Sequence, residues 1–330
     1  MQISKNNFLD HFRLFREAAK VAGGEAILPF DSMNALVRHG GDHWVFFPQF
    51  LASVDGVRQY QKVLTDDAFM FAGWLPYQLK RWDIASDKLA FKRYAESVGI
   101  TVPPYSSARD KSLRGVIVKK AKSSFGAQIR GPFGYPVDAP IDLASGEYYE
   151  QFVEGTLVKV WYWNEEPVCA ELDRMPSVVG DGVSDLRALI LARADQTGVS
   201  KPAEREKVLS LCALLLRHFG KDLGTVLDKG VRQIVEFRYG SMLMQPTDRQ
   251  VVRIDRASGK AWMAPLWPMG LRLVEAIPPE SRPQTLFTVD AVLDRAEKLW
   301  VLEMNSNPTV HPLAYPAIVA GAMQPQQGRL

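Results

Sequence analysis

The first hundred residues combine helical and strand-like patterns. Over residues 8–21, apolar side chains recur three and four positions apart, which predicts an amphipathic helix that ends at Gly23-Gly24. The apolar run at residues 44–47 indicates a buried strand, and aromatic residues are frequent after it. Residues 87–98 predict a second helix, which has Ser86 or Asp87 as its N-cap and Gly99 as its stop. We place a domain boundary at the start of this helix.

From residue 115 onward, short strand-like segments replace this pattern. Strands are predicted over residues 115–120, 146–153, 158–163 and 167–172, with a hairpin turn at residues 164–166. Helices are predicted over residues 184–194 and 203–218, followed by strands at residues 234–237 and 286–293. No internal repeat or low-complexity tract interrupts this order. The pattern and the chain length together indicate a protein of two or three domains that mixes helices and strands.

The composition excludes several classes of partner. The 330 residues are 47% hydrophobic and 23% charged, and 40 basic against 37 acidic side chains leave a net charge of +3. Because Lys and Arg form no dense stripe, we expect no nucleic-acid partner. No apolar run could span a membrane and the first residues lack a signal core, so we expect a cytoplasmic protein without a membrane partner. Cys169 and Cys212 lie in apolar contexts and are expected to be buried, reduced thiols.

Two strand ends near the C-terminus carry oxygen ligands. The apolar run at residues 299–302 leads into Glu303 and Asn305, and another strand-like stretch ends on Asp290. On adjacent strands, these residues would bring two carboxylates and one carboxamide together. Such hard oxygen donors suit Mg²⁺ carrying the phosphates of a nucleotide better than they suit zinc or copper. The pattern therefore predicts a protein that uses ATP.

Further upstream, a lysine and a small-residue turn could bind phosphate. Lys119 ends an apolar strand, and the segment Lys-Ser-Ser-Phe-Gly-Ala follows at residues 122–127. Successive backbone N–H groups in such a turn can contact phosphate oxygens. The same sequence is also that of an ordinary flexible turn between two strands.

Two more strand ends could contact a ligand. The strand that contains Glu150 leaves its sheet near Gly155, where backbone N–H and C=O groups could meet the edge of an adenine. Arg174 ends a strand just before the turn Gly180-Asp181-Gly182 and could clamp an anion. Taken alone, an arginine at such a place is more often a surface or ion-pairing residue.

The order of these features resembles that of the ATP-grasp superfamily over residues 86 to about 312. The spacing of Asp290, Glu303 and Asn305 is similar to the metal triad of D-alanine:D-alanine ligases. The run from Arg174 to Gly182 is similar to cyanophycin synthetases, and the series as a whole also resembles glutathione synthetases. The resemblance implies an α/β fold in which ATP binds between two α+β subdomains, here residues 86–154 and 155–330. Residues 1–85 would form a divergent N-terminal α/β domain that holds substrate.

The resemblance also implies a role for each matching residue. The phosphates of ATP would be bound by Lys88, Lys119, Lys159 and a loop that contains Ser123, Ser124, Phe125, Gly126 and Ala127. Glu150, Phe152 and Val153 match the adenine hinge. Asp290, Glu303 and Asn305 match the ligands of two Mg²⁺ ions, for which Mn²⁺ could substitute. Arg174 matches an arginine that faces the acyl phosphate, and together with Lys119 it would be catalytic.

Three departures from the family pattern concern the substrates. Leu157 stands where relatives place the acid that binds the ribose, and Glu154 could replace it. Thr288 stands where some relatives place an arginine that stabilises the tetrahedral intermediate, so Arg272, Arg282 or Arg238 would have to serve. Residues 1–85 do not closely resemble the usual leading domain, so the acceptor substrate cannot be read from the sequence.

The resemblance implies an ADP-forming ligase that makes a C–N bond through an acyl phosphate. Its substrates would be an amine and a small carboxylate, such as an amino acid or peptide. An ATP-grasp kinase that stops at phosphoryl transfer, or a nucleotide-binding module without turnover, are the alternatives. His311 lies just after the metal ligands, where it could contact substrate or be a loop histidine without a catalytic role. A homodimer remains open as the assembly.

Overall fold

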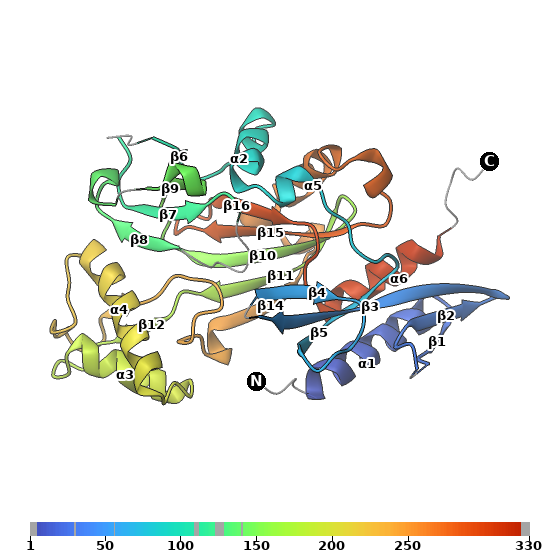
Figure 1. Cartoon of the computed structure of the whole chain (residues 1–330), viewed down its shortest axis with the longest axis horizontal. Helices are drawn as coiled ribbons and strands as arrows, with labels where there is room; N and C mark the ends of the chain where they lie inside the picture. Colours follow the sequence, from blue (N-terminus) through green and yellow to red (C-terminus); the bar gives the residue numbers. More distant parts are fainter. Residues whose placement is uncertain are drawn as a thin grey trace.

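The computed structural model describes residues 5–29, 31–55, 57–108, 112–122, 129–139 and 141–324. Within these ranges the strands form four antiparallel sheets, with helices beside them (Figure 1). This mixed architecture confirms the predicted α/β class. None of the described helices is both long enough and apolar enough to cross a bilayer.

The N-terminal part is a curved sheet with one helix against it. Helix α1 (Lys5–Val21) precedes β1 (Glu25–Ile27), β2 (Ala35–His39), β3 (Asp42–Val54), β4 (Val57–Gln61) and β5 (Ala68–Leu75). The 13-residue strand β3 is the centre of the sheet, because it pairs first with β2 and then with both β4 and β5. The helix predicted at residues 8–21 and the strand predicted at residues 44–47 are thus both present, within longer elements.

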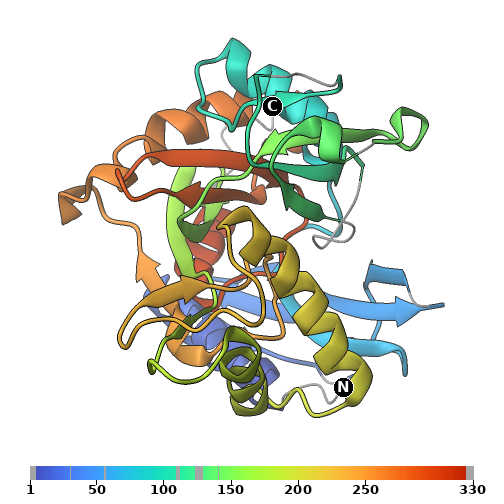
Figure 2. The ribbon, with the colours of Figure 1, turned by 90° about the vertical axis from the view of Figure 1, so that its left-hand side faces the viewer.

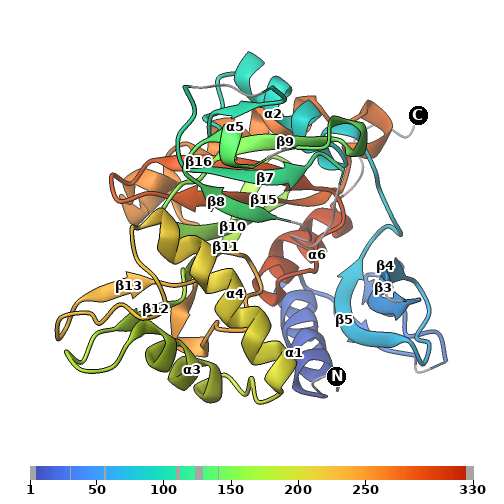
Figure 3. The same cartoon turned by 60° about the vertical axis from the view of Figure 1, so that its left-hand side comes forward.

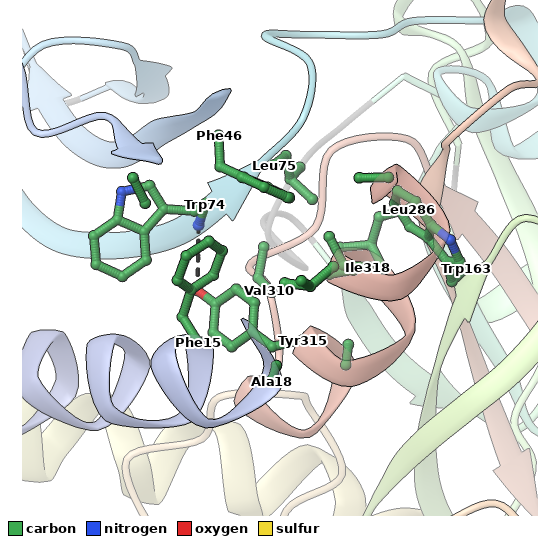
Figure 4. Packing of buried hydrophobic residues seen from close by; sticks show 14 of the residues in the cluster. Phe15, Ala18, Phe46, Trp74, Leu75, Trp163, Leu286, Val310, Tyr315 and Ile318 are labelled. Atoms are coloured by element: carbon green, nitrogen blue, oxygen red, sulfur yellow. Dashed lines mark hydrogen bonds between the residues drawn. The ribbon is translucent and has the colours of Figure 1, made fainter. Parts of the chain in front are cut away.

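The last helix of the chain, α6 (Tyr315–Met323), completes the core of this part. α1 and α6 lie side by side, next to the N-terminal sheet (Figures 1 and 3). The ring of Phe15 meets Tyr315 edge to face and also contacts Trp74, with centroid distances of 5.4 and 5.6 Å (Figure 4). The Tyr315 hydroxyl accepts a hydrogen bond from the Trp74 backbone N–H at 3.2 Å and lies 2.7 Å from Nδ1 of His11. This buried network joins α1, β5 and α6.

The second sheet follows helix α2 (Lys88–Ser97). Asp87 caps this helix, because its carboxylate accepts hydrogen bonds from the backbone N–H groups of Leu89 and Ala90 at 2.9 and 3.0 Å. The sheet has the strand order β6-β9-β7-β8. These strands are β6 (Tyr105–Ser106), β7 (Val116–Lys120), β8 (Arg130–Phe133) and β9 (Glu147–Gln151).

The third sheet, which we call the large sheet, has the order β14-β11-β10-β15-β16. Its strands are β10 (Thr156–Trp163), β11 (Glu166–Arg174), β14 (Arg249–Arg253), β15 (Leu286–Leu293) and β16 (Leu299–Asn305). Because successive side chains along each strand point to opposite sides, the large sheet has two different faces. One face buries Val158, Val160, Val289 and Ala291 against α2 and α5 (Leu266–Glu275). The opposite face presents Lys159, Trp161, Thr288 and Asp290 to a cleft.

Helices α3 (Leu186–Gln196) and α4 (Pro202–His218) pack on a small sheet made of β12 (Ser177–Val179) and β13 (Arg232–Ile234). Figure 2 views the molecule from the side of these two helices (olive). Short 3-10 helices complete the described chain: Asp83–Ala85, Pro136–Asp138, Leu143–Ser145, Pro246–Asp248, Arg256–Ser258, Ala261–Met263, Pro279–Ser281 and Pro312–Ala314.

Two sequence expectations need correction. Asp290 does not end a strand, because Ala291, Val292 and Leu293 continue β15 and pair with β16 on the far side of a bulge. The strand predicted at residues 234–237 lies earlier, at Arg232–Ile234, where it pairs with β12. Cys169 and Cys212 are buried free thiols, as predicted.

We expect acid to destabilise the fold through His11. Burial, and secondarily the charge of His311, lowers the pKa of His11 from 6.5 to about 3. His11 therefore binds a proton below pH 6.5 in the unfolded chain but only near pH 3 in the folded chain. The free energy of unfolding falls as the pH drops from 6.5 toward 3. At pH 5 this contribution amounts to about 2 kcal/mol. Urea denaturation at pH 8 and pH 5 should show a smaller difference for His11→Gln than for the wild type.

The exposed His43 provides the control for this experiment. His43→Gln should retain the full pH dependence of the wild type. An unchanged pH dependence in His11→Gln would refute the assignment.

Candidate functional site

A cleft of about 1090 Å³ lies between the second sheet, the large sheet and the N-terminal sheet. Helix α2 and strands β7 and β9 supply one wall, and the large sheet supplies the floor. Leu51, Tyr60, Phe69 and Met70 of the N-terminal sheet line the opposite end. Three parts of the chain that are far apart in sequence thus meet around one cavity.

One row of charged residues crosses the floor of the cleft. In the strand register Glu171 is opposite Lys159, Lys159 is opposite Asp290, and Asp290 is opposite Glu303. Opposed residues of antiparallel strands project from the same face, so all four side chains stand together. Lys159 Nζ is 2.8 Å from Asp290 Oδ1, and Lys88 Nζ from α2 reaches Glu303 Oε2 at 3.1 Å. The lysines and acids predicted from the sequence therefore meet in space.

A buried ion-pair cluster forms the wall above Lys88. Glu150 is 1% exposed and is contacted by Lys92 Nζ at 2.6 Å and by Lys119 Nζ at 3.1 Å. Burial alone would raise the pKa of Glu150, but the two lysine charges outweigh it and hold the pKa below its usual value. The same carboxylate raises the pKa of Lys119 against the effect of burial. The Glu150 side chain therefore fixes two lysines, and Phe152 and Val153 beyond it line the cleft.

The two acids on β15 and β16 have opposite pKa shifts. Burial is the largest influence on Asp290, and with the nearby charge of Glu303 it raises the Asp290 pKa despite Lys159. Burial also acts on Glu303, but Lys88 and Lys119 outweigh it and lower the Glu303 pKa. Two carboxylates at opposed positions repel each other, so a cation between them would favour the charged form of both.

The donor atoms of this pair fit a hard divalent cation. Asp290 and Glu303 are cross-strand neighbours, and the Asn305 carboxamide is close enough to donate from Nδ2 to Asp290 Oδ2 at 3.2 Å. Two carboxylates and one carboxamide oxygen are ligands of the kind that Mg²⁺ and Mn²⁺ take. Among the described residues no group of three or more His, Cys, Asp or Glu side chains could hold a metal ion. Because all three side chains offer oxygen donors, the set suits a hard cation better than zinc.

Several predicted site residues lie elsewhere. Arg174 is exposed at the end of β11, donates to the Thr247 carbonyl at 2.6 Å and is not part of the cleft lining. Glu154 pairs with Arg295 outside the lining. The predicted loop residues Ser123, Ser124, Phe125, Gly126 and Ala127 lie outside the described residues.

Among the three arginines considered as replacements for the one missing at Thr288, Arg238 lines the cleft. Arg272 is exposed on α5, and Arg282 donates to the Ile277 carbonyl at 2.6 Å. Sequence reasoning did not identify Glu171, Tyr239 or Arg249, which line the cleft near His311. No motif marks these residues, because strand pairing alone brings them to the cavity.

No family model and no curated protein matches this chain. Similar solved structures include a bifunctional glutathione synthetase from Pasteurella multocida, with 14% identity over 88% of this chain and 40% of that one, at a TM-score of 0.38. D-alanine–D-alanine ligase from Bacillus anthracis, solved with ATP, has 12% identity over 72% and 62% of the chains, at 0.38. The ATP-grasp ligase PsnB, solved with a minimal precursor, has 12% identity over 72% and 59%, at 0.39.

The chain is similar to solved ATP-grasp ligases. It spans less than two thirds of the length of each of these three proteins.

We expect Glu150 to be a structural requirement of the site. Glu150→Ala would leave Lys92 and Lys119 buried without their counter-charge, which should lower the free energy of unfolding by about 3 to 5 kcal/mol. Glu206→Ala, the same change at an exposed position of α4, should stay within about 0.5 kcal/mol. Urea denaturation measures both variants. A loss below about 1 kcal/mol for Glu150→Ala would contradict the role of this cluster.

Proposed function

We propose that this protein is an ATP-dependent ligase of the ATP-grasp type, which joins a carboxylate to an amine and releases ADP and phosphate. The observation that carries the proposal is the meeting of Lys88, Lys119 and Lys159 with Asp290 and Glu303 in one cleft. These residues come from four strands and one helix. A polyphosphate that binds together with divalent cations needs lysines to contact its oxygens and carboxylates to hold the cations.

The lysines would bind the phosphates of ATP from two sides. Lys88 stands at the start of α2, and Lys119 comes from β7 with its ammonium group held by Glu150. Lys159 approaches from the floor of the cleft. Adenine would lie against Phe152, Val153 and Leu157, which form an apolar part of the lining. This arrangement would place ATP between residues 86–154 and 155–330, the two proposed subdomains.

Asp290, Glu303 and Asn305 would hold the divalent cations. Bound there, Mg²⁺ or Mn²⁺ would neutralise oxygens of the transferring phosphoryl group. The chain itself would orient the phosphates, through Lys88 and Lys119, in line with the attacking oxygen. Asp290 and Glu303 are already paired with lysines. When nucleotide and cation bind, the phosphates would take over the lysines and the cations would take over the carboxylates.

The reaction we propose has two steps. An oxygen of the substrate carboxylate attacks the γ-phosphorus, the bond to the β-phosphate oxygen breaks, and an acyl phosphate and ADP form. The nitrogen of the neutral amine then attacks the acyl carbon, phosphate leaves with the former carboxylate oxygen, and the nitrogen loses one proton to give the amide. Neither step needs a nucleophilic side chain, so the chain has to position the reactants and stabilise charge.

A kinase or a binding module would use the same nucleotide site. A kinase would release ADP without any dependence on an amine, and a binding module would bind ATP without releasing ADP. The cleft favours a ligase because it extends well beyond the proposed metal ligands, to Tyr60, Phe69 and Met70 of the N-terminal sheet. This extension offers room for a second substrate, and residues 1–85 would contribute to its binding.

We expect Glu303→Gln to abolish ADP release and to weaken Mg²⁺-dependent nucleotide binding at least about tenfold, because a neutral amide is a poorer ligand for a hard cation. The binding of a fluorescent ATP analogue, titrated with and without Mg²⁺, measures the effect. Glu297→Gln makes the same change at an exposed position in the β15–β16 turn and should behave as the wild type. Wild-type binding by Glu303→Gln would sink the metal assignment.

A second experiment compares two arginines at the reacting centre. Arg238 lines the cleft, pairs with Glu236 at 2.8 Å and would face the acyl phosphate, whereas Arg174 is exposed at the end of β11. Arg238→Ala should lower turnover of bound substrate about hundredfold, as the loss of one charge-stabilising donor does. Arg174→Ala should change it less than about threefold. A larger loss in Arg174→Ala would instead support the role that the sequence resemblance gives Arg174.

A further inference from the structure

The cleft continues past Lys159 into a region that we call the distal pocket. Its residues are Tyr60, Trp161, Glu171, Tyr239, Thr288 and His311, all of which line the cavity. The row across the floor places Glu171 two strands away from Asp290. With strands about 4.8 Å apart, the two backbones are about 10 Å apart. The distal pocket is therefore beside the proposed metal ligands, on the side where a second substrate would enter.

The carboxylates around Glu171 outnumber the positive charges that contact them. Arg249 is held by Asp173 through two hydrogen bonds of 2.7 Å, while its distance to Glu171 is 3.5 Å. Lys159, the cross-strand neighbour of Glu171, pairs with Asp290 at 2.8 Å. Three carboxylates thus share two cations, and Glu171 has the longest contact among them. One more positive charge would balance this group.

The other neighbours of Glu171 are neutral and aromatic. Tyr239 donates its hydroxyl toward Glu171 Oε2 at 3.4 Å. His311 Nε2 is 3.8 Å from Glu171 Oε1, too far for a hydrogen bond. Burial lowers the pKa of His311 to about 4, so the imidazole is neutral at pH 7. Trp161 meets His311 edge to face at 5.1 Å. A carboxylate among aromatic rings is a setting in which proteins bind ammonium groups.

A second, independent feature also indicates a ligand. Thr288 is fully buried, lines the cleft, and its hydroxyl oxygen has no hydrogen-bond partner among the described residues. Its cross-strand neighbour is Trp161, so the hydroxyl lies beside the distal pocket. Buried hydroxyl groups are nearly always hydrogen-bonded, and a substrate atom could supply the missing partner.

We propose that the distal pocket binds a primary ammonium group of the amine substrate, with Glu171 as its counter-charge and Thr288 as a second contact. The inference rests on the proposed function only in calling this ligand a substrate of the ligase. It deepens that proposal by giving the second substrate a positive charge and by naming a residue that selects for it. No bond is made or broken in this binding step.

Binding of small probes to the whole chain tests the proposal without turnover. Saturation-transfer NMR would compare n-butylammonium with the neutral butan-1-ol and the anionic butanoate. We expect n-butylammonium to bind and the two other probes to bind at least about tenfold more weakly. Glu171→Gln should lose this preference, while Glu171→Asp, which keeps the charge, should retain most of it.

Glu166→Gln is the matched control, because it makes the same change on the same strand at an exposed position paired with Arg256. It should leave the preference intact. Equal binding of the three probes by the wild type, or an unchanged preference in a folded Glu171→Gln, would overturn the proposal. Nucleotide binding by Glu171→Gln is measured in parallel and should stay as in the wild type. If n-butylammonium binds but ATP does not, the pocket stands and the ligase proposal fails.

Discussion

The antiparallel register of β10, β15 and β16 determines the chemistry of the cleft. A shift by one residue would turn Lys159, Asp290 and Glu303 toward α2 and α5, where the large sheet buries apolar side chains. Val158, Val160 and Val289 prevent this shift, because they would then face the open cleft. The apolar core thus fixes the positions of the charged residues on the other face. Packing and function depend on the same alternation.

Charges in the cleft are held in place before any ligand arrives. Removing Lys92, Lys119 and Glu150 from water is unfavourable, and their mutual contacts at 2.6 and 3.1 Å offset much of this cost. Such a cluster contributes little net stability, but it holds the Lys119 ammonium group in one position. A lysine fixed in this way needs little reorganisation when a phosphate binds. In the proposed function, the buried cluster would therefore serve preorganisation of the site more than stability of the fold.

The sequence predicts the parts of this structure that depend on local pattern. Apolar periodicity identifies α1 and α4, and the alternation at residues 286–293 matches β15. The local pattern does not predict α5 or α6. α6 is apolar on nearly all sides, α5 contains Pro268 and Gly270, and neither helix has an N-cap side chain that makes a hydrogen bond. The local pattern also does not predict which strands pair. Glu171 and Arg249 enter the site only because β11 and β14 pair beside β10.

The distal pocket cannot be predicted from sequence motifs, because its shape depends on how the N-terminal sheet is attached. The segment after Asn305 runs directly to this sheet, where the Val310 N–H donates to the Ala72 carbonyl at 2.7 Å. Next to it, Gly73 has a φ of +112°, and a Cβ there would lie 2.5 Å from Val310 Cβ. The end of β16 and the wall formed by β3, β4 and β5 are therefore held together by close backbone contact. The shape of the distal pocket depends on this junction, which joins residues 238 positions apart and leaves no local signature in the sequence.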